Sequence, residues 1–486
     1  MCSVPNTFFQ TGSEPGHLSE TLTQQVMRSV RERIASRQLS TGARLPSIRS
    51  LAQSMRVSKS TVVDAYDRLA AEGVIQARRG SGFYVSAPAM PLSLMDVGPR
   101  LDRDVDPLWV AHQALTAGNA MLKPGCGWLP PDWLPHDTLR KALRSCARAD
   151  TATLGDYGSP LGLGPLRQLL ARRAAEASID VTPEQIVLTD SGTQSLDLIC
   201  RLLLEPGDTV LVDDPCYFNF HALLRAHQAR IVGVPFTPSG PDLERFEHAL
   251  IAHKPRLYMT NSATQNPTGA TLSPLVAHRV LRLAEQHGLL IVEDDIFADF
   301  QKEPSPRLAA FDGLRHVVHV GSFSKTLSGA VRCGYIAARP DWISKLVDLK
   351  IATTFGGNSL AIELVYRMLK DGSYRRYVES LRLRLAQTMG PVVARLESLG
   401  IKPWIRPDAG MFLWCRLPEG VDAADLARAA LKENIVLAPG NVFSLSQSAS
   451  DFLRFNIAQS GDDELYQVLE RLLKTKELLG ILPGRC

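Results

Sequence analysis

The sequence predicts a large α/β domain preceded by a small, mainly α-helical unit that ends in a two-stranded hairpin. Beyond about residue 107, short apolar strand-like runs alternate with helix-like segments, as in a mostly parallel sheet. Within the first 88 residues, three amphipathic helical patterns precede two short strand-like runs. At 486 residues the chain is also too long for one ordinary core, so we expect more than one domain.

The composition is that of a globular protein whose charge is unevenly distributed. Apolar residues make up 45% and charged residues 21% of the chain. The net charge is only +4, yet residues 18–88 hold eleven Lys and Arg against five Asp and Glu. The eight cysteines include no C-x-x-C pair, and no apolar run reaches membrane-spanning length. Since a signal-peptide pattern is also missing, we expect a cytoplasmic protein with no zinc site, no disulfide and no membrane contact.

A helical unit is expected at residues 18–88, after a disordered tail at residues 1–17. The periodicity predicts three helices and then two strands, at residues 18–36, 48–55, 58–72, 74–78 and 83–86. Ser47 stands where it can cap the second helix, and Gly73 stands where the third must end.

The second and third helices form a helix-turn-helix in which the third begins with Ser58, Lys59, Ser60 and Thr61. Small polar and basic side chains, together with free amides at a helix N-terminus, can reach phosphates and base edges in a DNA major groove. The basic turn at residues 79–82 suits a wing. A three-helix core with solvated charges is the alternative, and the turn and the concentration of positive charge argue against it.

This segment closely resembles the winged-helix DNA-binding domain of the GntR family of bacterial regulators. The resemblance rests on Leu-Pro-Ser-Ile-Arg at residues 45–49, Val-Ser-Lys-Ser-Thr-Val at 57–62 and Gly-Ser-Gly at 80–82. It implies DNA contacts from Arg49, Ser58, Lys59, Ser60, Thr61, Arg79 and Gly80. Many relatives carry arginine at the position of Lys59, and a lysine binds phosphate as a point charge without the fork that reads guanine.

Residues 89–106 are expected to form an extended connector, because prolines and charges occur there without periodicity. Such a connector either lets the two domains move independently or crosses to a partner subunit. The sequence leaves both possibilities open.

The large domain is expected over residues 107–486. Its strand-like runs lie at residues 185–188, 209–212, 230–234, 256–259, 289–292, 317–320 and 335–338. Because loops at strand ends carry the chemistry in α/β folds, the residues that follow these runs are candidate site residues. After about residue 342, a long helical stretch leads to a smaller C-terminal α+β subdomain.

The most informative motif is Gly-Ser-Phe-Ser-Lys at residues 321–325, which places Lys325 where a strand ends and a loop begins. Ser322 and Ser324 can bind phosphate oxygens, and Arg332 can add a bidentate clamp. A lysine amine beside a phosphate cradle suggests a Schiff base with pyridoxal 5′-phosphate (PLP). A solvated lysine in a serine-rich loop is the commoner alternative for an isolated motif.

Four further loops carry groups that suit the same cofactor. Residues 192–194 open a helix, where free amides and a hydroxyl can hold a phosphate. Tyr217 can stack on a planar ring, and Asn266 can donate to the phenolic oxygen of the cofactor. An ionised Asp294 can pair with a protonated pyridine nitrogen. Each loop alone also has an ordinary interpretation as a helix cap, a packing aromatic, a turn or a solvated carboxylate.

In this order, before Lys325, the motifs resemble the fold-type I (class I and II) aminotransferases over about residues 123–460. The resemblance makes Lys325 the Schiff-base lysine, Asp294 the pyridinium partner and Asn266 the phenolate-oxygen donor. It assigns ring stacking to Tyr217. It implies a phosphate cradle of Gly192, Thr193, Gln194, Ser322, Ser324 and Arg332.

The same resemblance implies a homodimer, in which Tyr157 reaches the phosphate of the other subunit. Arg454 would clamp the α-carboxylate of a substrate or effector. Phe297 departs from the family, since many members carry a tyrosine at this position. Because the phenol that would share the cofactor O3′ is missing, we expect a raised imine pKa and weaker transamination than in a dedicated enzyme.

A winged helix joined by a linker to an aminotransferase-like domain is the layout of the MocR subgroup of GntR regulators. The resemblance covers nearly the whole chain. It implies a dimer that binds promoter DNA and rearranges its winged helices when PLP and an amino-acid or amine effector bind at Lys325. The alternative is a working PLP-dependent aminotransferase with an auxiliary N-terminal domain. A DNA binder with an inactive large domain is disfavoured, because nearly every cofactor contact is present.

Overall fold

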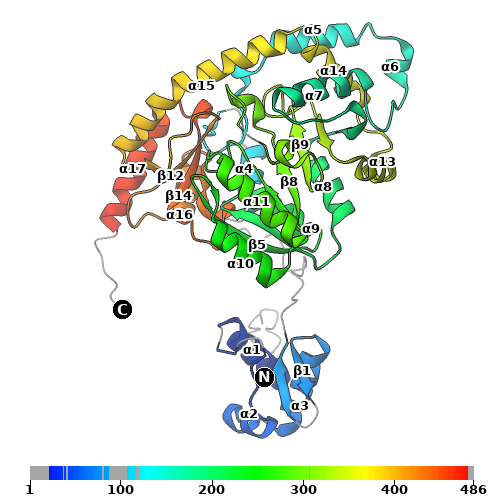
Figure 1. Ribbon diagram of the computed structural model, residues 1–486. Coiled ribbons are helices and arrows are strands. Elements are labelled where there is room, and N and C mark those ends of the chain that lie inside the picture. The colour runs from blue at the N-terminus through cyan, green and yellow to red at the C-terminus, as the bar shows by residue number, and fades with distance from the viewer. Residues whose placement is uncertain are drawn as a thin grey trace, which may run out of the picture. The chain divides into compact units, whose positions relative to one another are not determined.

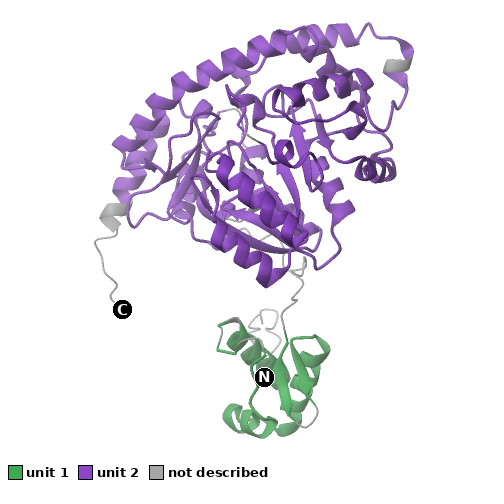
Figure 2. Ribbon diagram, viewed as in Figure 1, with its two compact units in different colours: residues 1–100 green, residues 101–486 purple. Residues whose placement is uncertain are grey.

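The chain forms two compact units, residues 1–100 and 101–486 (Figure 2). The computed structural model describes residues 21–36, 38–39, 42–78, 81–86, 107–116, 118, 120–305 and 307–479. The predicted tail, the predicted linker and two predicted DNA contacts, Arg79 and Gly80, lie outside these residues. None of the described helices combines the length and the apolar character that crossing a membrane requires.

The described residues of the N-terminal unit form three helices and a hairpin (Figure 1). In chain order these are α1 (Leu22–Ala35), α2 (Ile48–Met55), α3 (Lys59–Ala71), β1 (Ile75–Arg78) and β2 (Gly82–Val85). The two strands pair in antiparallel fashion, with Ile75 opposite Val85. Type and order agree with the elements predicted from the sequence, and differences are confined to their ends.

Hydroxyl caps and one buried tyrosine hold the helix-turn-helix together. The side chains of Ser47 and Ser58 accept hydrogen bonds from backbone amides three residues on, which begins α2 and α3. Arg56, at φ 55°, ends α2 in the left-handed conformation. The buried Tyr66 of α3 donates from its hydroxyl to the carbonyl of Pro46 at 2.9 Å. This bond ties α3 to the segment that precedes α2.

An eight-stranded sheet in the order β3-β10-β9-β8-β7-β4-β5-β6 forms the centre of the large unit (Figure 1). Its strands are β3 (Ile186–Thr189), β4 (Thr209–Asp214), β5 (Arg230–Thr237), β6 (Gly240–Pro241), β7 (Leu257–Thr260), β8 (Leu290–Asp294), β9 (Val317–Ser322) and β10 (Gly334–Ala337). The central strands are parallel, whereas β10 is antiparallel to both β3 and β9. Every strand predicted for the large domain lies in this sheet, so the predicted α/β fold is confirmed.

Helices cover both faces of this sheet, which explains why its strands are apolar without alternation. Along β3, Val187 and Leu188 belong to different apolar clusters, as neighbouring side chains of a strand must. One cluster includes residues of α7 (Gly164–Glu176), α10 (Leu243–His253), α11 (Pro274–His287), α12 (Leu308–Asp312) and α14 (Ser359–Leu369). The other includes residues of α8 (Gly192–Leu203), α9 (Phe218–Ala226) and α13 (Pro340–Thr354).

The C-terminal part has its own four-stranded sheet, in the order β11-β12-β14-β13. These strands are β11 (Lys402–Pro403), β12 (Phe412–Arg416), β13 (Ala438–Pro439) and β14 (Phe452–Asn456). The helices α15 (Ser373–Ser398), α16 (Ala423–Lys432) and α17 (Asp463–Leu479) pack with this sheet. This part confirms the predicted smaller α+β subdomain. Helices α4 (Pro107–Thr116), α5 (His136–Cys146) and α6 (Thr151–Gly155) precede the large sheet in the chain.

Candidate cofactor site and nucleic-acid interface

Lys325 lies three residues beyond the end of β9, with its amine inside the protein. The Nζ atom donates to the carbonyl of Gly127 at 2.8 Å. Burial lowers the pKa of this amine to about 8, an effect that Arg454 reinforces and Asp294 opposes. A lowered pKa increases the neutral, nucleophilic fraction of a lysine near neutral pH, as covalent attachment of a carbonyl cofactor requires.

Asp294 ends β8, directly beside β9, where it pairs in register with Val320. Its side chain is buried, and it forms no ion pair with any described residue. Burial raises the pKa of this carboxyl to about 7, although hydrogen bonds oppose the shift, among them one from the amide of Ile296. A buried carboxyl that feels the Lys325 amine but forms no ion pair among the described residues fits a partner that brings its own positive charge, such as a pyridinium nitrogen.

Arg454 and Asn266 face each other although 188 residues separate them in the chain. From β14, Arg454 donates through Nη1 to the Oδ1 atom of Asn266 at 2.7 Å and through Nη2 to the carbonyl of Gly125 at 2.6 Å. Its Nε is buried and has no hydrogen-bond partner among the described residues. Burial lowers the pKa of the guanidinium to about 10. An incompletely satisfied buried guanidinium suits an incoming carboxylate.

Tyr217 lies in the same electrostatic environment, immediately before α9. Burial raises the pKa of its phenol to about 12, with a further contribution from Asp294, while Arg454 and Arg332 oppose the shift. The ring of Tyr217 packs edge-on against Phe220 at a centroid distance of 5.5 Å. The structure therefore brings this aromatic ring close to the charged groups around Lys325.

The predicted phosphate cradle lies where α8 begins beside the loop after β9. A Cβ atom on Gly192 would meet the Cβ atom of Ser322 at 3.4 Å, so these segments touch. Ser322 accepts from the amide of Ser324 at 3.2 Å and donates to its hydroxyl at 3.1 Å. Backbone amides at the start of α8 and two hydroxyls thus stand together, which is an arrangement that binds phosphate.

Other predicted cradle residues are placed differently. The side chain of Gln194 accepts from the amide of Asp190 at 2.6 Å, so it turns back from the start of α8. Thr193 and Arg332 are exposed. Tyr157 is 73% exposed and packs edge-on against Phe355 at 5.0 Å. Within the described part of the chain, no hydrogen bond joins Tyr157 to another predicted site residue.

The structure adds one loop that the sequence did not predict, at residues 125–128. Its carbonyl groups accept from Arg454, from Lys325 and, at 2.9 and 2.8 Å, from the side-chain amide of Asn456. A Cβ atom on Gly125 would lie 2.4 Å from the backbone of Leu437, so only glycine fits there. The Gly-Cys-Gly sequence at residues 125–127 was the available signal for such a close approach.

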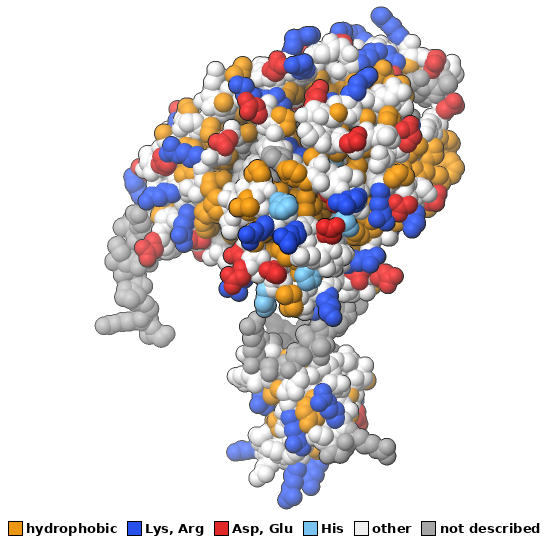
Figure 3. Space-filling model, viewed as in Figure 1, with side chains coloured by type: hydrophobic (Ala, Val, Ile, Leu, Met, Phe, Trp, Pro, Cys, Tyr) orange, Lys and Arg blue, Asp and Glu red, His pale blue; other side chains and the backbone are white. Residues whose placement is uncertain are grey.

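In the N-terminal unit, three of the predicted DNA contacts form a hydroxyl cluster at the start of α3. The Oγ atom of Ser58 lies 2.7 Å from Oγ of Ser60 and 2.8 Å from Oγ1 of Thr61. Lys59 and Arg49 are exposed. Lys and Arg side chains are prominent on the visible face of this unit, and acidic ones are few (Figure 3). The surface therefore combines positive charge with clustered, exposed hydroxyl side chains, which are groups that contact phosphates.

Two cations near the hairpin were not predicted as contacts. The guanidinium of Arg78, in β1, lies 4.5 Å from the ring centre of Tyr84. The Nε atom of Arg44 would lie 3.6 Å from a Cβ atom on Gly82. The only sequence signal for either residue was the general excess of positive charge before residue 88.

Comparison with known families decides what this arrangement is. Residues 131–472 match the family "Aminotransferase class I and II". The chain belongs to this family. Residues 22–85 match "Bacterial regulatory proteins, gntR family". An aminotransferase-family domain preceded by a GntR domain is the layout of the MocR subgroup, so that prediction is confirmed.

Relatives of this aminotransferase-family chain fall into two groups. The "Uncharacterized HTH-type transcriptional regulator YdcR" of Escherichia coli is 33% identical, and the match spans 93% of this chain and 98% of its own length. The "2-aminoadipate transaminase" of Thermus thermophilus is 32% identical over 71% of this chain and 88% of its own. A solved structure also matches: the crystal structure of LysN, the α-aminoadipate aminotransferase of the same organism, in complex with N-(5′-phosphopyridoxyl)-L-leucine. Its TM-score is 0.69 at 29% sequence identity, and the match covers 77% of this chain and 96% of the LysN chain.

Proposed function

We propose that this chain is a PLP-dependent, DNA-binding transcriptional regulator whose aminotransferase-like part senses PLP and an amino-acid or amine ligand. The supporting observation is that one chain carries both a Lys325–Asp294–Arg454 constellation and a winged helix with an exposed basic surface. A transaminase has no need of a helix-turn-helix. A simple DNA binder has no need of a buried lysine with a lowered pKa.

Bound PLP supplies an electron sink for chemistry at the α-carbon of amino compounds. In the proposed arrangement Lys325 holds the cofactor covalently and Asp294 keeps its ring nitrogen protonated. Because Arg454 occupies Oδ1 of Asn266, the amide nitrogen of Asn266 is the end that donates to the phenolic oxygen. The incompletely satisfied guanidinium of Arg454 then orients the ligand carboxylate.

We also propose that the chain acts as a homodimer in which Tyr157 completes the phosphate site of the other subunit. Tyr157, Phe355 and Leu360 are all at least half exposed. They belong to adjoining segments, since a Cβ atom on Gly158 would lie 3.5 Å from the side chain of Ser359. Large apolar side chains gathered on a surface favour a protein partner. Sedimentation analysis of wild type and Phe355→Glu tests this, and monomeric wild-type protein would refute it.

The test of the regulator proposal is a titration of labelled upstream promoter DNA with the full chain, with and without PLP and a panel of amino acids. Specific binding should survive excess competitor DNA and fall steeply with salt. The Lys325→Ala variant should bind this DNA equally with and without PLP. Failure to bind the DNA under every condition would refute the proposal.

An active aminotransferase is the second candidate, because Lys325, Asp294 and Arg454 all lie in one site. The amino-group balance between a 2-amino acid and a 2-oxo acid distinguishes the two functions. Turnover that is independent of DNA, in a protein that binds no promoter specifically, would favour the enzyme.

A further inference from the structure

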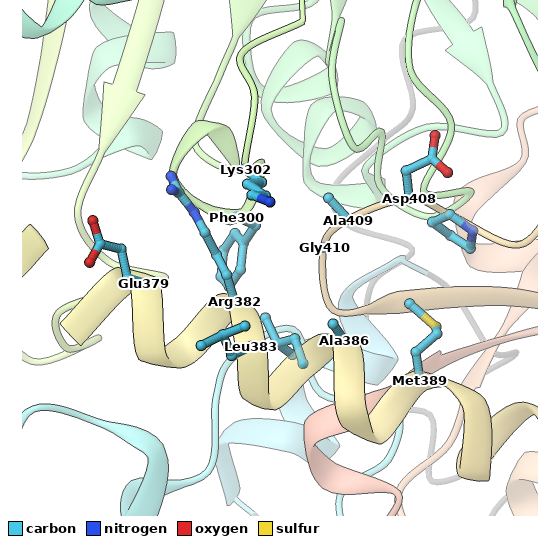
Figure 4. A pocket seen from close by; sticks show the side chains of 12 residues that line it. Phe300, Lys302, Glu379, Arg382, Leu383, Ala386, Met389, Asp408, Ala409 and Gly410 are labelled. Atoms are coloured by element: carbon cyan, nitrogen blue, oxygen red, sulfur yellow. The ribbon is translucent and has the colours of Figure 1, made fainter. Parts of the chain in front are cut away.

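A cavity of about 490 Å³ lies between α15 and the loops at residues 300–302 and 407–410 (Figure 4). None of the predicted cofactor-site residues lines it. Its walls are mainly apolar, and Leu383, Ala386 and Met389 come from α15. Its volume falls within the range of about 300–1,000 Å³ that is common for small-molecule sites.

Two cations reach this cavity from opposite walls, Arg382 from α15 and Lys302 from the facing loop (Figure 4). The ammonium of Lys302 forms no hydrogen bond or ion pair with any described residue. Arg382 donates only through Nε, to the backbone carbonyl of Asp299 at 2.8 Å, which leaves both of its terminal nitrogens available among the described groups. An available guanidinium and ammonium above an apolar floor favour an anion with an apolar body.

The acidic side chains of the lining do not cancel this preference. Glu379 is already paired with Arg375 at 3.2 Å. Asp408 lies toward the Met389 end, on the side away from Arg382 (Figure 4). The cavity therefore has one cationic end and a mainly apolar remainder, which matches a carboxylate carried by a short hydrocarbon or aromatic group.

A chain of hydrogen bonds leads from Arg382 to the residue next to Lys325. The backbone carbonyl of Asp299 accepts the hydrogen bond from Arg382. The carboxylate of the same residue accepts a hydrogen bond from the hydroxyl of Tyr374 and pairs with Arg173. The Tyr374 hydroxyl lies 2.6 Å from Oγ1 of Thr326. Tyr374 and Thr326 are buried, so these bonds operate in a low-dielectric environment where their geometry is tightly constrained.

The opposite wall of the cavity backs the turn that carries Asn266. A Cβ atom on Gly269 would lie 2.6 Å from Cγ of Pro407, so the turn and the wall are in close contact. A Cβ atom on Gly410 would lie 3.4 Å from the side chain of Thr264. A molecule in the cavity thus contacts two segments, one linked through Asp299 and Tyr374 to Thr326 and the other packed against the turn that carries Asn266.

We propose that this cavity is a second ligand site, which binds a small carboxylate with an apolar body and changes how tightly the Lys325 site holds PLP. The effect on PLP binding rests on the proposed function. Carboxylate binding in the cavity does not depend on the proposed function. The coupling is thermodynamic, so PLP must change the affinity for the carboxylate by the same factor.

Calorimetric titration of the full chain without PLP tests the binding, with octanoate as the probe and octanamide as its uncharged match. Octanoate should bind saturably and octanamide about tenfold or more weaker, because a charged partner is lost. Lys302→Gln should weaken octanoate by a similar factor. Arg376→Gln is the control, since Arg376 lies exposed on the same helix but does not line the cavity.

A filling variant keeps the test independent of charge. Ala386→Trp, which occupies the cavity, should abolish octanoate binding, whereas Gln387→Trp should not, because Gln387 is an exposed neighbour that does not line it. Equal binding by both variants, or no saturable octanoate binding by wild type, would overturn the proposal. Binding that disappears in Arg454→Leu but survives in Ala386→Trp would overturn it too, because the ligand would then occupy the Arg454 site.

The coupling is read from the PLP dissociation constant and the absorbance of bound PLP, each with and without octanoate. Octanoate should change both in wild type. It should change neither in Tyr374→Phe, which lacks the hydroxyl between Asp299 and Thr326 but keeps the cavity. Octanoate binding with unchanged PLP affinity in wild type would overturn the coupling. A chain that binds no PLP at all would refute the proposed function, while the calorimetric result on the cavity would stand.

Discussion

Replacing Asp294 by asparagine should stabilise the PLP-free protein at alkaline pH although it removes a predicted cofactor contact. Below its ordinary pKa of 3.8, the carboxyl is protonated in both the folded and the unfolded chain, so its burial does not lower the free energy of unfolding through ionisation. As the pH rises, the unfolded carboxyl ionises first, and the folded state loses stability until the pH passes the folded pKa of about 7. Asparagine keeps the shape and an acceptor for the Ile296 amide but never ionises.

The pKa difference sets the size of this effect. A shift from 3.8 to about 7 corresponds to about 4 kcal/mol of destabilisation at pH 8, at about 1.4 kcal/mol per pKa unit. At pH 5 the same relation gives about 2 kcal/mol of destabilisation. The stability advantage of Asp294→Asn over wild type should therefore grow by roughly 2–3 kcal/mol between pH 5 and pH 8.

Urea unfolding followed by tryptophan fluorescence measures this difference. The six tryptophans all lie beyond residue 108, so the signal reports on the large unit alone. Wild type and variant are compared at pH 5 and pH 8 without PLP. Adding PLP at pH 8 should stabilise wild type and leave the variant nearly unchanged, since only wild type offers a carboxylate to the ring nitrogen.

The neighbouring residue provides a matched control with the opposite sign. Asp295 is also buried, but it pairs with Arg307 at 2.8 Å and His319 at 3.2 Å, which hold the pKa of its carboxyl below the usual range against the effect of burial. Asp295→Asn leaves Arg307 buried without its counterion and should cost about 3–5 kcal/mol at both pH values. If Asp294→Asn were no more stable than wild type at pH 8, or if its advantage did not grow with pH, the electrostatic reasoning would be wrong.

Three further predictions concern the cofactor ring and the DNA-binding unit. Phe297→Tyr adds a hydroxyl that the family resemblance places near the phenolic oxygen of the cofactor, and it should lower the pKa read from bound-PLP absorbance by about one unit; identical titration curves would contradict this. Ser58→Ala removes the 3.0 Å cap bond of α3 and should destabilise the N-terminal unit by about 1 kcal/mol in thermal unfolding followed by circular dichroism, so an unchanged transition would count against the cap. Lys59→Ala should reduce the slope of log binding constant against log salt by about one, and an unaltered slope would exclude a phosphate contact.

The sequence predicts the strands of the large unit well, because a sheet covered on both faces leaves uninterrupted apolar runs. Asp294 and Lys325 are recognisable for the same reason, since each stands at or just beyond the end of such a run. Local signals also locate the helix-turn-helix, where Ser47 and Ser58 cap their helices as the pattern requires.

Local sequence signals do not predict contacts between segments that are distant in the chain. The Arg454 bond to Gly125 spans 329 residues, and nothing in either local sequence indicates the other. The side chain of Gln194 turns to Asp190 because the backbone amide of Asp190 donates to it. The sequence motif does not show that this amide competes with a phosphate for the Gln194 side chain. The cavity beside α15 depends on three segments meeting, so only the folded chain reveals it.

The bonds from β14 to the loop at residues 125–128 complete the Lys325 site with residues that the ribosome adds long after those of the helix-turn-helix. The DNA-binding unit is complete once residue 86 has emerged, but the Lys325 site lacks Arg454 and Asn456 until residue 456 has been made. At about 5–20 residues per second, this interval lasts roughly 20–70 s. Each nascent chain therefore possesses a finished helix-turn-helix well before it possesses a complete cofactor site.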